Sequence, residues 1–159
     1  MSKVRPMAQP FKEARKFWAD KTMLTPKEYG QLEDAARAKA FAVSGVAKAD
    51  QLETMFNSLS RGVDGTATFA DFKKDVAAIA EKRGWGDYRL ETIFRTNVQT
   101  AFMVGRYGQI QKTARLRPYG QMSAVNDKRT RAEHFALHGR VWPLDSPFWD
   151  TWWPPNGFR

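Results

Sequence analysis

Residues 88–115, YRLETIFRTNVQTAFMVGRYGQIQKTAR, carry the longest helical pattern of the chain. Apolar or small residues recur along this segment at helical spacing: Leu90, Ile93, Phe94, Val98, Ala101, Phe102 and Gly105. Basic residues lie between them, and Pro118 ends the pattern because proline cannot continue the hydrogen bonding of a helix. The segment therefore predicts one long helix with an apolar face.

Several shorter helical patterns precede this segment. Thr25, Pro26 and Glu28 form a helix start, with a capping threonine, a proline at the first helical position and a glutamate that completes a capping box. Apolar spacing predicts that this helix continues to Gly45. Similar patterns predict helices at residues 11–18, at residues 48–62 and from Thr68 to Gly84. Together they predict a helical body over residues 1–105.

The periodicity changes after Pro118. Residues 117–127 and 140–144 are consistent with two short strands, and residues 131–139 fit two turns of helix between them. Four of the six tryptophans lie near the end of the chain. We therefore predict a mainly α fold with a small C-terminal α+β module, in which residues 106–159 hold the basic end of the long helix and a compact tryptophan-rich cap.

The composition limits the class of protein. The chain has 159 residues and no cysteine, so disulfides and thiolate chemistry are excluded within this span. No apolar run approaches the roughly 18 residues that a membrane span needs, and the first residues lack the apolar core of a secretory signal. We therefore expect no membrane association and a cytoplasmic product.

The positive charge is concentrated in one stretch. The chain has a net charge of +9, and residues 106–140 hold eight basic but only two acidic residues. A local field of this kind favours an anionic partner, most often nucleic acid. No groove-reading motif accompanies it, which favours contact without sequence preference. The candidate nucleic-acid contacts are Lys112, Arg115, Arg117, Lys128 and Arg129.

The stretch DKRTRAEHFALHGRVWPLDSPFWDTWWPPNGFR, residues 127–159, resembles a catalytic or metal site. His134 and His138 are four residues apart and share one face of a helix, but zinc needs three or four ligands. Asp127, Glu133 and His134 could orient one another, yet no nucleophile accompanies them. We therefore assign no catalytic residue, and the two histidines remain weak metal candidates.

A structural interpretation explains more of this stretch. Asp127 can cap a turn and pair with Arg129 or Arg131, and Gly139 lets the short helix end. Five large aromatic residues follow: Trp142, Phe148, Trp149, Trp152 and Trp153. They are expected to bury a large area, either as a local core or as anchors that dock on a partner.

The order D-x-R-T-R-x-E-H-x-x-L-x-G, then V-W-P-L-D, P-F-W and P-P-N-G, resembles the C-terminal signature of the Mu F-like minor head proteins, the phage head morphogenesis family of tailed bacteriophages. The helical segments upstream are similar too, so the resemblance covers residues 21–159. Its motif residues, with a structural role, are Asp127, Arg129, Thr130, Arg131, Glu133, His134, Gly139, Trp142, Asp145, Trp149, Pro155 and Gly157.

The resemblance implies a non-enzymatic virion component in the inner head near the portal vertex. It implies roles in head assembly and in the handling or ejection of packaged DNA. The implied partners are the portal protein, the major capsid protein and double-stranded DNA without sequence preference. No cofactor is implied by the residues at hand. Members commonly continue with a Cys-x-Cys pair, so we expect a continuation beyond Arg159, whose thiols could join His134 at a zinc site.

Two rival functions remain open. One is a sequence-independent DNA-binding protein that acts during packaging, which would use the charge but not the helical body. The other is a metal-dependent hydrolase that uses His134, His138 and Asp127. Steep salt dependence of duplex binding without portal affinity would favour the first. Activity that depends on added metal would favour the second.

Overall fold

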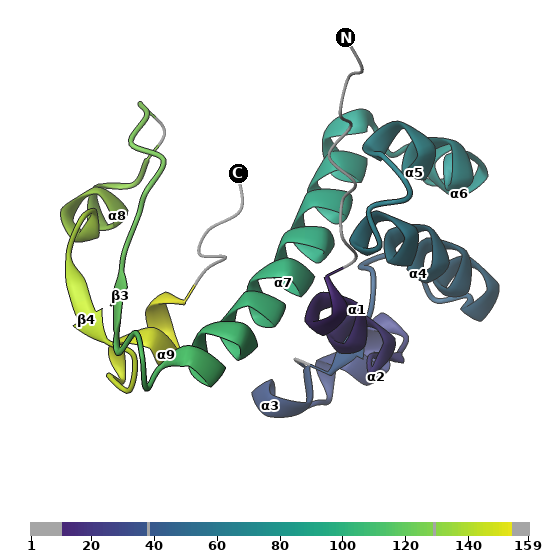
Figure 1. Ribbon diagram of the computed structural model, residues 1–159. Coiled ribbons are helices and arrows are strands. Elements are labelled where there is room, and N and C mark those ends of the chain that lie inside the picture. Colours follow the sequence, from purple (N-terminus) through teal and green to yellow (C-terminus); the bar gives the residue numbers. More distant parts are fainter. Residues whose placement is uncertain (1–10, 38, 129, 154–159) are drawn as a thin grey trace, which may run out of the picture. The chain divides into compact units, whose positions relative to one another are not determined.

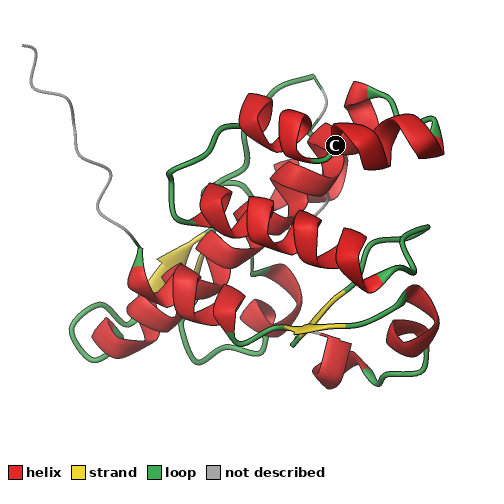
Figure 2. Cartoon of the chain, turned by 90° about the vertical axis from the view of Figure 1, so that its right-hand side faces the viewer, coloured by secondary structure: helices red, strands yellow, loops and turns green. Residues whose placement is uncertain are grey.

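The computed structural model describes residues 11–37, 39–128 and 130–153. Within them the chain divides into two compact units, residues 11–106 and residues 107–153. Most described residues are helical, and the strands are short (Figure 2). The predicted mainly α fold with short C-terminal strands is confirmed. Among the helices of the described part, none is both long and apolar enough to cross a bilayer.

The N-terminal unit is a bundle of short helices with one small sheet (Figure 1). In chain order its elements are α1 (Lys12–Ala19), β1 (Thr22–Met23), α2 (Pro26–Gly30), α3 (Asp34–Arg37), β2 (Ala40–Phe41), α4 (Ala49–Val63), α5 (Phe69–Asp75) and α6 (Ala77–Arg83). The long helix α7 (Asp87–Thr113) begins in this unit and ends in the next. It matches the prediction for residues 88–115 closely.

The core of this unit is aromatic. Trp18 on α1 stacks on Phe56 of α4, with ring centroids 5.0 Å apart, and meets the edge of Phe41 at 5.5 Å. Phe72 on α5 is fully buried and lies 5.5 Å from the ring of Phe94 on α7. These contacts join α1, α4, α5 and α7, so the predicted apolar stripes do face a common core.

The continuous helix predicted from Thr25 to Gly45 is wrong. Its start is confirmed, because Thr25 caps α2 with the expected Glu28 capping box. The chain then forms two short helices and enters β2, which pairs in parallel with β1. This pairing places Phe41 in the core at 2% exposure. Burial of an aromatic side chain outweighs helix propensity, which amounts to less than about 0.7 kcal/mol for an ordinary residue.

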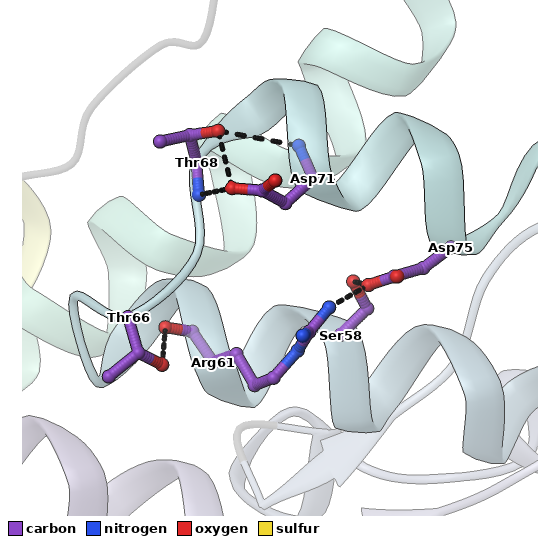
Figure 3. A network of polar contacts seen from close by, with 6 residues as sticks. All are labelled: Ser58, Arg61, Thr66, Thr68, Asp71 and Asp75. Carbon is purple, nitrogen blue, oxygen red and sulfur yellow. Dashed lines mark hydrogen bonds and ion pairs between the residues drawn. The ribbon is translucent and has the colours of Figure 1, made fainter.

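The helix predicted from Thr68 to Gly84 is present but divided at Val76. Val76 ends α5 and precedes α6, with φ −101° and ψ 9°. It is fully buried. The preceding residue, Asp75, pairs with α4: the Ser58 hydroxyl and an Arg61 guanidinium nitrogen both donate to Asp75 Oδ2 (Figure 3). The helix is therefore divided at a point where Val76 is buried and where Asp75 holds the end of α5 against α4.

Thr68 and Asp71 form a second capping box at the start of α5 (Figure 3). Asp71 Oδ2 accepts hydrogen bonds from the Thr68 backbone amide at 2.8 Å and from the Thr68 hydroxyl at 2.7 Å. These two bonds, the backbone one first, hold the pKa of Asp71 below its ordinary value of 3.8. Because the folded pKa is depressed, the carboxylate stabilises the fold at neutral pH, and this contribution is lost as the pH falls below about 4.

A Thr68→Val substitution is expected to raise the pKa of Asp71 back toward 3.8. The valine removes the hydroxyl donor but keeps the backbone amide, so the recovery is partial. Carboxyl carbon shifts in an NMR titration measure this directly. Glu28, whose pKa is lowered by the hydroxyl and then the amide of Thr25, is the internal control and stays unchanged. An Asp71 that already titrates at its ordinary value in the parent would contradict the capping box.

Candidate functional site

The C-terminal unit is built on an antiparallel hairpin of β3 (Tyr119–Gln121) and β4 (Val141–Pro143), with α8 (Ala132–Leu137) between the strands and α9 (Phe148–Trp152) after them. The two strands and α8 were predicted, whereas α9 was not. The register pairs Tyr119 with Pro143, Gly120 with Trp142 and Gln121 with Val141. Because side chains alternate along a strand, Gly120 and Trp142 share one face of the hairpin and the other four share the opposite face.

Trp149 of α9 packs on the Gly120 face. A Cβ atom at Gly120 would lie 2.6 Å from a ring carbon of Trp149, so this glycine lets the ring approach the strand. Trp149 is 4% exposed, and its Nε1 donates to the carbonyl oxygen of Pro143 at 2.8 Å. Met122 and Leu144 are buried beside it. The Gly120 face is therefore the inner face, and Trp149 is its centre.

The other aromatic residues surround this centre. Trp142 stacks on Phe148 with centroids 3.8 Å apart and rings 7° from parallel. Phe148 lies 6.1 Å from Trp152 at 15°, and Trp153 meets the edge of Tyr107 at 4.7 Å. All four of Trp142, Phe148, Trp152 and Trp153 are half-buried. The aromatic residues thus form a local core, one of the two predicted roles, and their docking on a partner stays a prediction.

Asp127 and Thr130 form a turn before α8. The Asp127 backbone amide donates to the Thr130 hydroxyl at 3.1 Å, and this hydroxyl donates to Asp127 Oδ1 at 3.3 Å. The Thr130 amide also donates to the Asp127 carbonyl at 3.0 Å. Asn126 before them adopts φ 65°, a conformation that asparagine tolerates. Asp127 and Thr130, the motif residues at the two ends of this turn, therefore stabilise its backbone through hydrogen bonds.

Arg131, Glu133 and His134 lie together at the start of α8. A Glu133 carboxylate oxygen is 3.8 Å from Arg131 Nη1 and 3.7 Å from His134 Nε2. The His134 side chain is 16% exposed, and its ring meets the edge of Trp152 at 5.6 Å. Of the two arginines expected to pair with Asp127, Arg131 instead lies beside Glu133, while Arg129 falls outside the described residues. His134 thus connects α8 to the aromatic core.

His138 has different surroundings from His134. Its Nδ1 accepts a hydrogen bond from the Ala124 backbone amide at 3.1 Å, which ties the end of α8 to the loop that follows β3. Across the ranges that the structure describes, no three residues among His, Cys, Asp and Glu are grouped so that they could hold a metal ion. In that part of the chain, His134, His138 and Asp127 therefore do not come together as the predicted metal hydrolase would need.

The remaining motif residues have local roles or lie beyond the described part. Gly139 adopts φ 78°, which ends α8, and its amide donates to the Met122 carbonyl at 2.8 Å. Asp145 is exposed in the turn after β4. Pro155 and Gly157 fall outside the described residues. Sequence reasoning thus located the turns correctly but did not predict the contacts between them.

The predicted nucleic-acid contacts do not form one cluster. Lys112 lies in the last turn of α7, and Arg115 and Arg117 follow between α7 and β3; all three are exposed. Lys128 is exposed in the loop 122–131, which lies beyond the other end of β3 (Figure 1). Arg129 falls outside the described residues. The basic residues therefore flank both ends of the hairpin.

Sequence reasoning missed the outer face of the hairpin. Tyr119 and Val141 are apolar residues on this face with exposed fractions of 65% and 54%. Arg140, directly before β4, is exposed as well. The alternation of residues 117–121 and 140–144 contained this signal, but the register was needed to place Tyr119 and Val141 on the same face.

The described residues thus form a mainly α protein, in which a helical body is followed by a tryptophan-rich hairpin module. The family described as Phage Mu protein F like protein matches residues 23–159, and the chain belongs to this family. The match covers most of the N-terminal unit and all described residues of the C-terminal unit, including the motif that begins at Asp127.

Two curated relatives are similar to the chain. The "Putative capsid assembly protein F" of Escherichia phage Mu is 37% identical over 94% of this chain and 38% of the relative. The "Mu-like prophage FluMu F protein" of Haemophilus influenzae is 38% identical over 80% of this chain and 34% of the relative. The chain therefore spans little more than a third of the length of these relatives. No solved structure matches the chain significantly.

Proposed function

We propose that the chain acts in head assembly of a tailed phage, as part of a non-enzymatic minor head protein. The observation that carries this proposal is the family match over residues 23–159, together with a relative named for capsid assembly. The architecture is compatible with it, because the motif residues of the C-terminal unit support turns and an aromatic core. A structural role explains these residues without requiring a reaction.

The finer part of the proposal is a place in the inner head, near the portal vertex. There the chain would contact the portal protein, the major capsid protein and packaged double-stranded DNA, and would influence how the DNA is held or ejected. The sequence resemblance is the basis for this location. The exposed basic residues at both ends of the hairpin support contact with DNA, since lysine and arginine side chains gain affinity by releasing counterions from phosphates.

Co-purification tests the location. The tagged chain is recovered from a lysate of infected cells with and without nuclease, and portal protein is measured in the eluate. Portal that remains after nuclease treatment would support a place held by protein contacts. Portal that is lost with the DNA would favour the second candidate function, a sequence-independent DNA-binding protein that acts during packaging. The net charge of +9 is the observation that keeps this candidate open.

Charge reversal tests the contact with DNA. We expect replacement of Lys112, Arg115, Arg117, Lys128 and Arg129 by glutamate to abolish most duplex binding by the chain. Each phosphate contact contributes about 0.9 to the slope of log affinity against log salt concentration, so five contacts would account for about 4.5. Titration of a labelled duplex at several salt concentrations measures this slope.

A matched variant controls for net charge. Lys12, Lys27, Lys48, Lys74 and Lys82 are exposed lysines of the N-terminal unit, and their replacement by glutamate changes the total charge equally. We expect this variant to keep most of the affinity and nearly the full slope. Equal losses in both variants would mean that the binding reflects net charge alone. Unchanged DNA retention and particle yield in the first variant would refute the DNA-facing role.

A further inference from the structure

The hairpin of the C-terminal unit has two edges, and they differ. In an antiparallel pair, residues alternate between positions that bond to the neighbouring strand and positions whose backbone groups point away from it. Leu144 donates to the Pro118 carbonyl at 2.8 Å and Met122 to the Arg140 carbonyl at 2.9 Å. Tyr119 and Gln121 lie between these bonded positions. Their amide and carbonyl groups therefore point outward from β3.

The outer edge of β4 is blocked at Pro143. Proline has no amide hydrogen, and the Pro143 carbonyl already accepts hydrogen bonds from Trp149 Nε1 at 2.8 Å and from the Ser146 amide at 3.1 Å. A further strand could therefore not pair along β4. Proline on an edge strand is a common device against unwanted pairing.

The outer edge of β3 has no such protection. The register places Tyr119 and Gln121 at the positions that do not bond to β4, and outside the β3–β4 pair no backbone hydrogen bond of the described residues uses their amide or carbonyl groups. The strand itself, Tyr-Gly-Gln, contains neither proline nor a charged residue. Tyr119 is 65% exposed beside this edge. An open edge of this kind is a template for strand addition.

The charge around β3 indicates what would pair with it. Arg115 and Arg117 precede the strand, and Arg140 lies across from its end, next to Met122. All three side chains are exposed, and the structure gives none of them an ion pair within its described ranges. A second copy of the chain would bring a like set of arginines against this one. An acidic segment would neutralise it.

We propose that β3 is a docking edge for an extended acidic segment of another protein, which adds to the hairpin as a third strand. The backbone of Tyr119 and Gln121 would bond to the incoming strand. Tyr119 would contact its apolar side chains on the outer face, and Arg115 and Arg117, which precede β3, would pair with its carboxylates. A third strand would also stabilise the hairpin, since two strands alone are marginally stable.

Selection from a library of random ten-residue peptides, with the whole chain as bait, tests this proposal. We expect enrichment of acidic peptides with alternating β-branched residues. In amide NMR spectra, such a peptide should shift Tyr119 and Gln121 most strongly and slow their hydrogen exchange. Recovery of basic or neutral peptides, or of peptides that shift other residues, would overturn the proposal.

A Gln121→Pro variant tests the backbone pairing at the edge of β3 without changing the charge of the protein. The substitution deletes an outward amide while leaving the bonds at Pro118, Gly120 and Met122 in place. We expect the selected peptide to bind about five- to tenfold more weakly, which corresponds to the loss of one hydrogen bond and of some packing between the peptide and β3. A Gln121→Thr variant keeps the amide and is expected to bind like the parent. Equal affinity for all three would exclude pairing through the edge.

The inference does not depend on the proposed place in the phage head. Gln121→Pro changes no charge, so it should leave duplex binding and its salt dependence unaltered. A duplex that shifts Tyr119 and Gln121 and is weakened by Gln121→Pro would instead assign this edge to DNA and overturn the proposal. Failure of the portal experiment would leave the peptide result unaffected.

Discussion

A Gly105→Ala variant is expected to lose about 1–3 kcal/mol of folding free energy, toward the upper end of that range. A Cβ atom at Gly105 would lie 2.7 Å from the backbone nitrogen of Ala14 and 3.1 Å from its Cα. Backbone atoms cannot rotate aside, so α1 and α7 would have to separate. That separation would disturb Trp18, which α1 contributes to the aromatic core of the N-terminal unit.

Gly108→Ala is the matched control on the same helix. Apart from the neighbouring backbone of α7 itself, no atom of the described residues lies within 4 Å of a Cβ at Gly108, so alanine should gain up to about 1 kcal/mol from its higher helix propensity. Gly62→Ala is an intermediate case, because its Cβ would meet the Phe94 ring at 2.8 Å, and a side chain can move. Urea denaturation followed by circular dichroism measures all three. A gain in stability for Gly105→Ala would contradict the close packing of α1 on α7.

The parts of the fold that could be predicted depend on local signals. The long helix α7 follows from apolar spacing sustained over many turns, and the starts of α2 and α5 follow from threonine caps with an acidic residue three positions later. The strands β3 and β4 follow from a change of period around Pro118. In each case the physical cause acts between residues only a few positions apart.

The parts that were missed depend on distant contacts. β1 and β2 are two residues long, and their pairing brings residue 22 to residue 40, so no periodic pattern identifies them. Phe41 leaves the predicted helix because Trp18 and Phe56 provide a core position for it. Helix α9 has five residues, of which three are aromatic, and such a short segment has no measurable period.

The residues of the candidate site were predicted from the sequence, but the contacts between them were not. The motif from Asp127 to Gly139 indicated caps and a short helix, which the turn at Thr130 and the positive φ of Gly139 bear out. The partners of Arg131 and His138 could not be foreseen, since they depend on how α8 folds back along the hairpin. The open edge of β3 required the register, which shows which amides bond to β4.

Replacement of Trp149 by alanine is expected to have the largest effect in the C-terminal unit, about 3–5 kcal/mol. Trp149 is 4% exposed and fills the inner face of the hairpin against Gly120 and Leu144. Its loss would also leave the Pro143 carbonyl without the Nε1 donor. The buried centre has few other members, namely Met122 and Leu144, so little remains to compensate for the lost area.

The effect should be confined to this unit. The core of residues 11–106 contains no side chain from residues 107–153. We therefore expect amide NMR signals of Tyr119–Gln121 to lose their dispersion in Trp149→Ala while those of α4 and α5 persist. Collapse of both sets would show that the two units unfold together.

Two further variants separate packing from the hydrogen bond. Trp149→Phe keeps most of the ring area but removes the Nε1 donor, so its cost should be about 1–2 kcal/mol. Tyr119→Ala changes an aromatic residue on the exposed face of the same hairpin and should cost less than about 0.5 kcal/mol. Equal losses for Trp149→Ala and Tyr119→Ala would mean that the two faces of the hairpin are packed to the same extent, which would contradict a buried inner face and an exposed outer face.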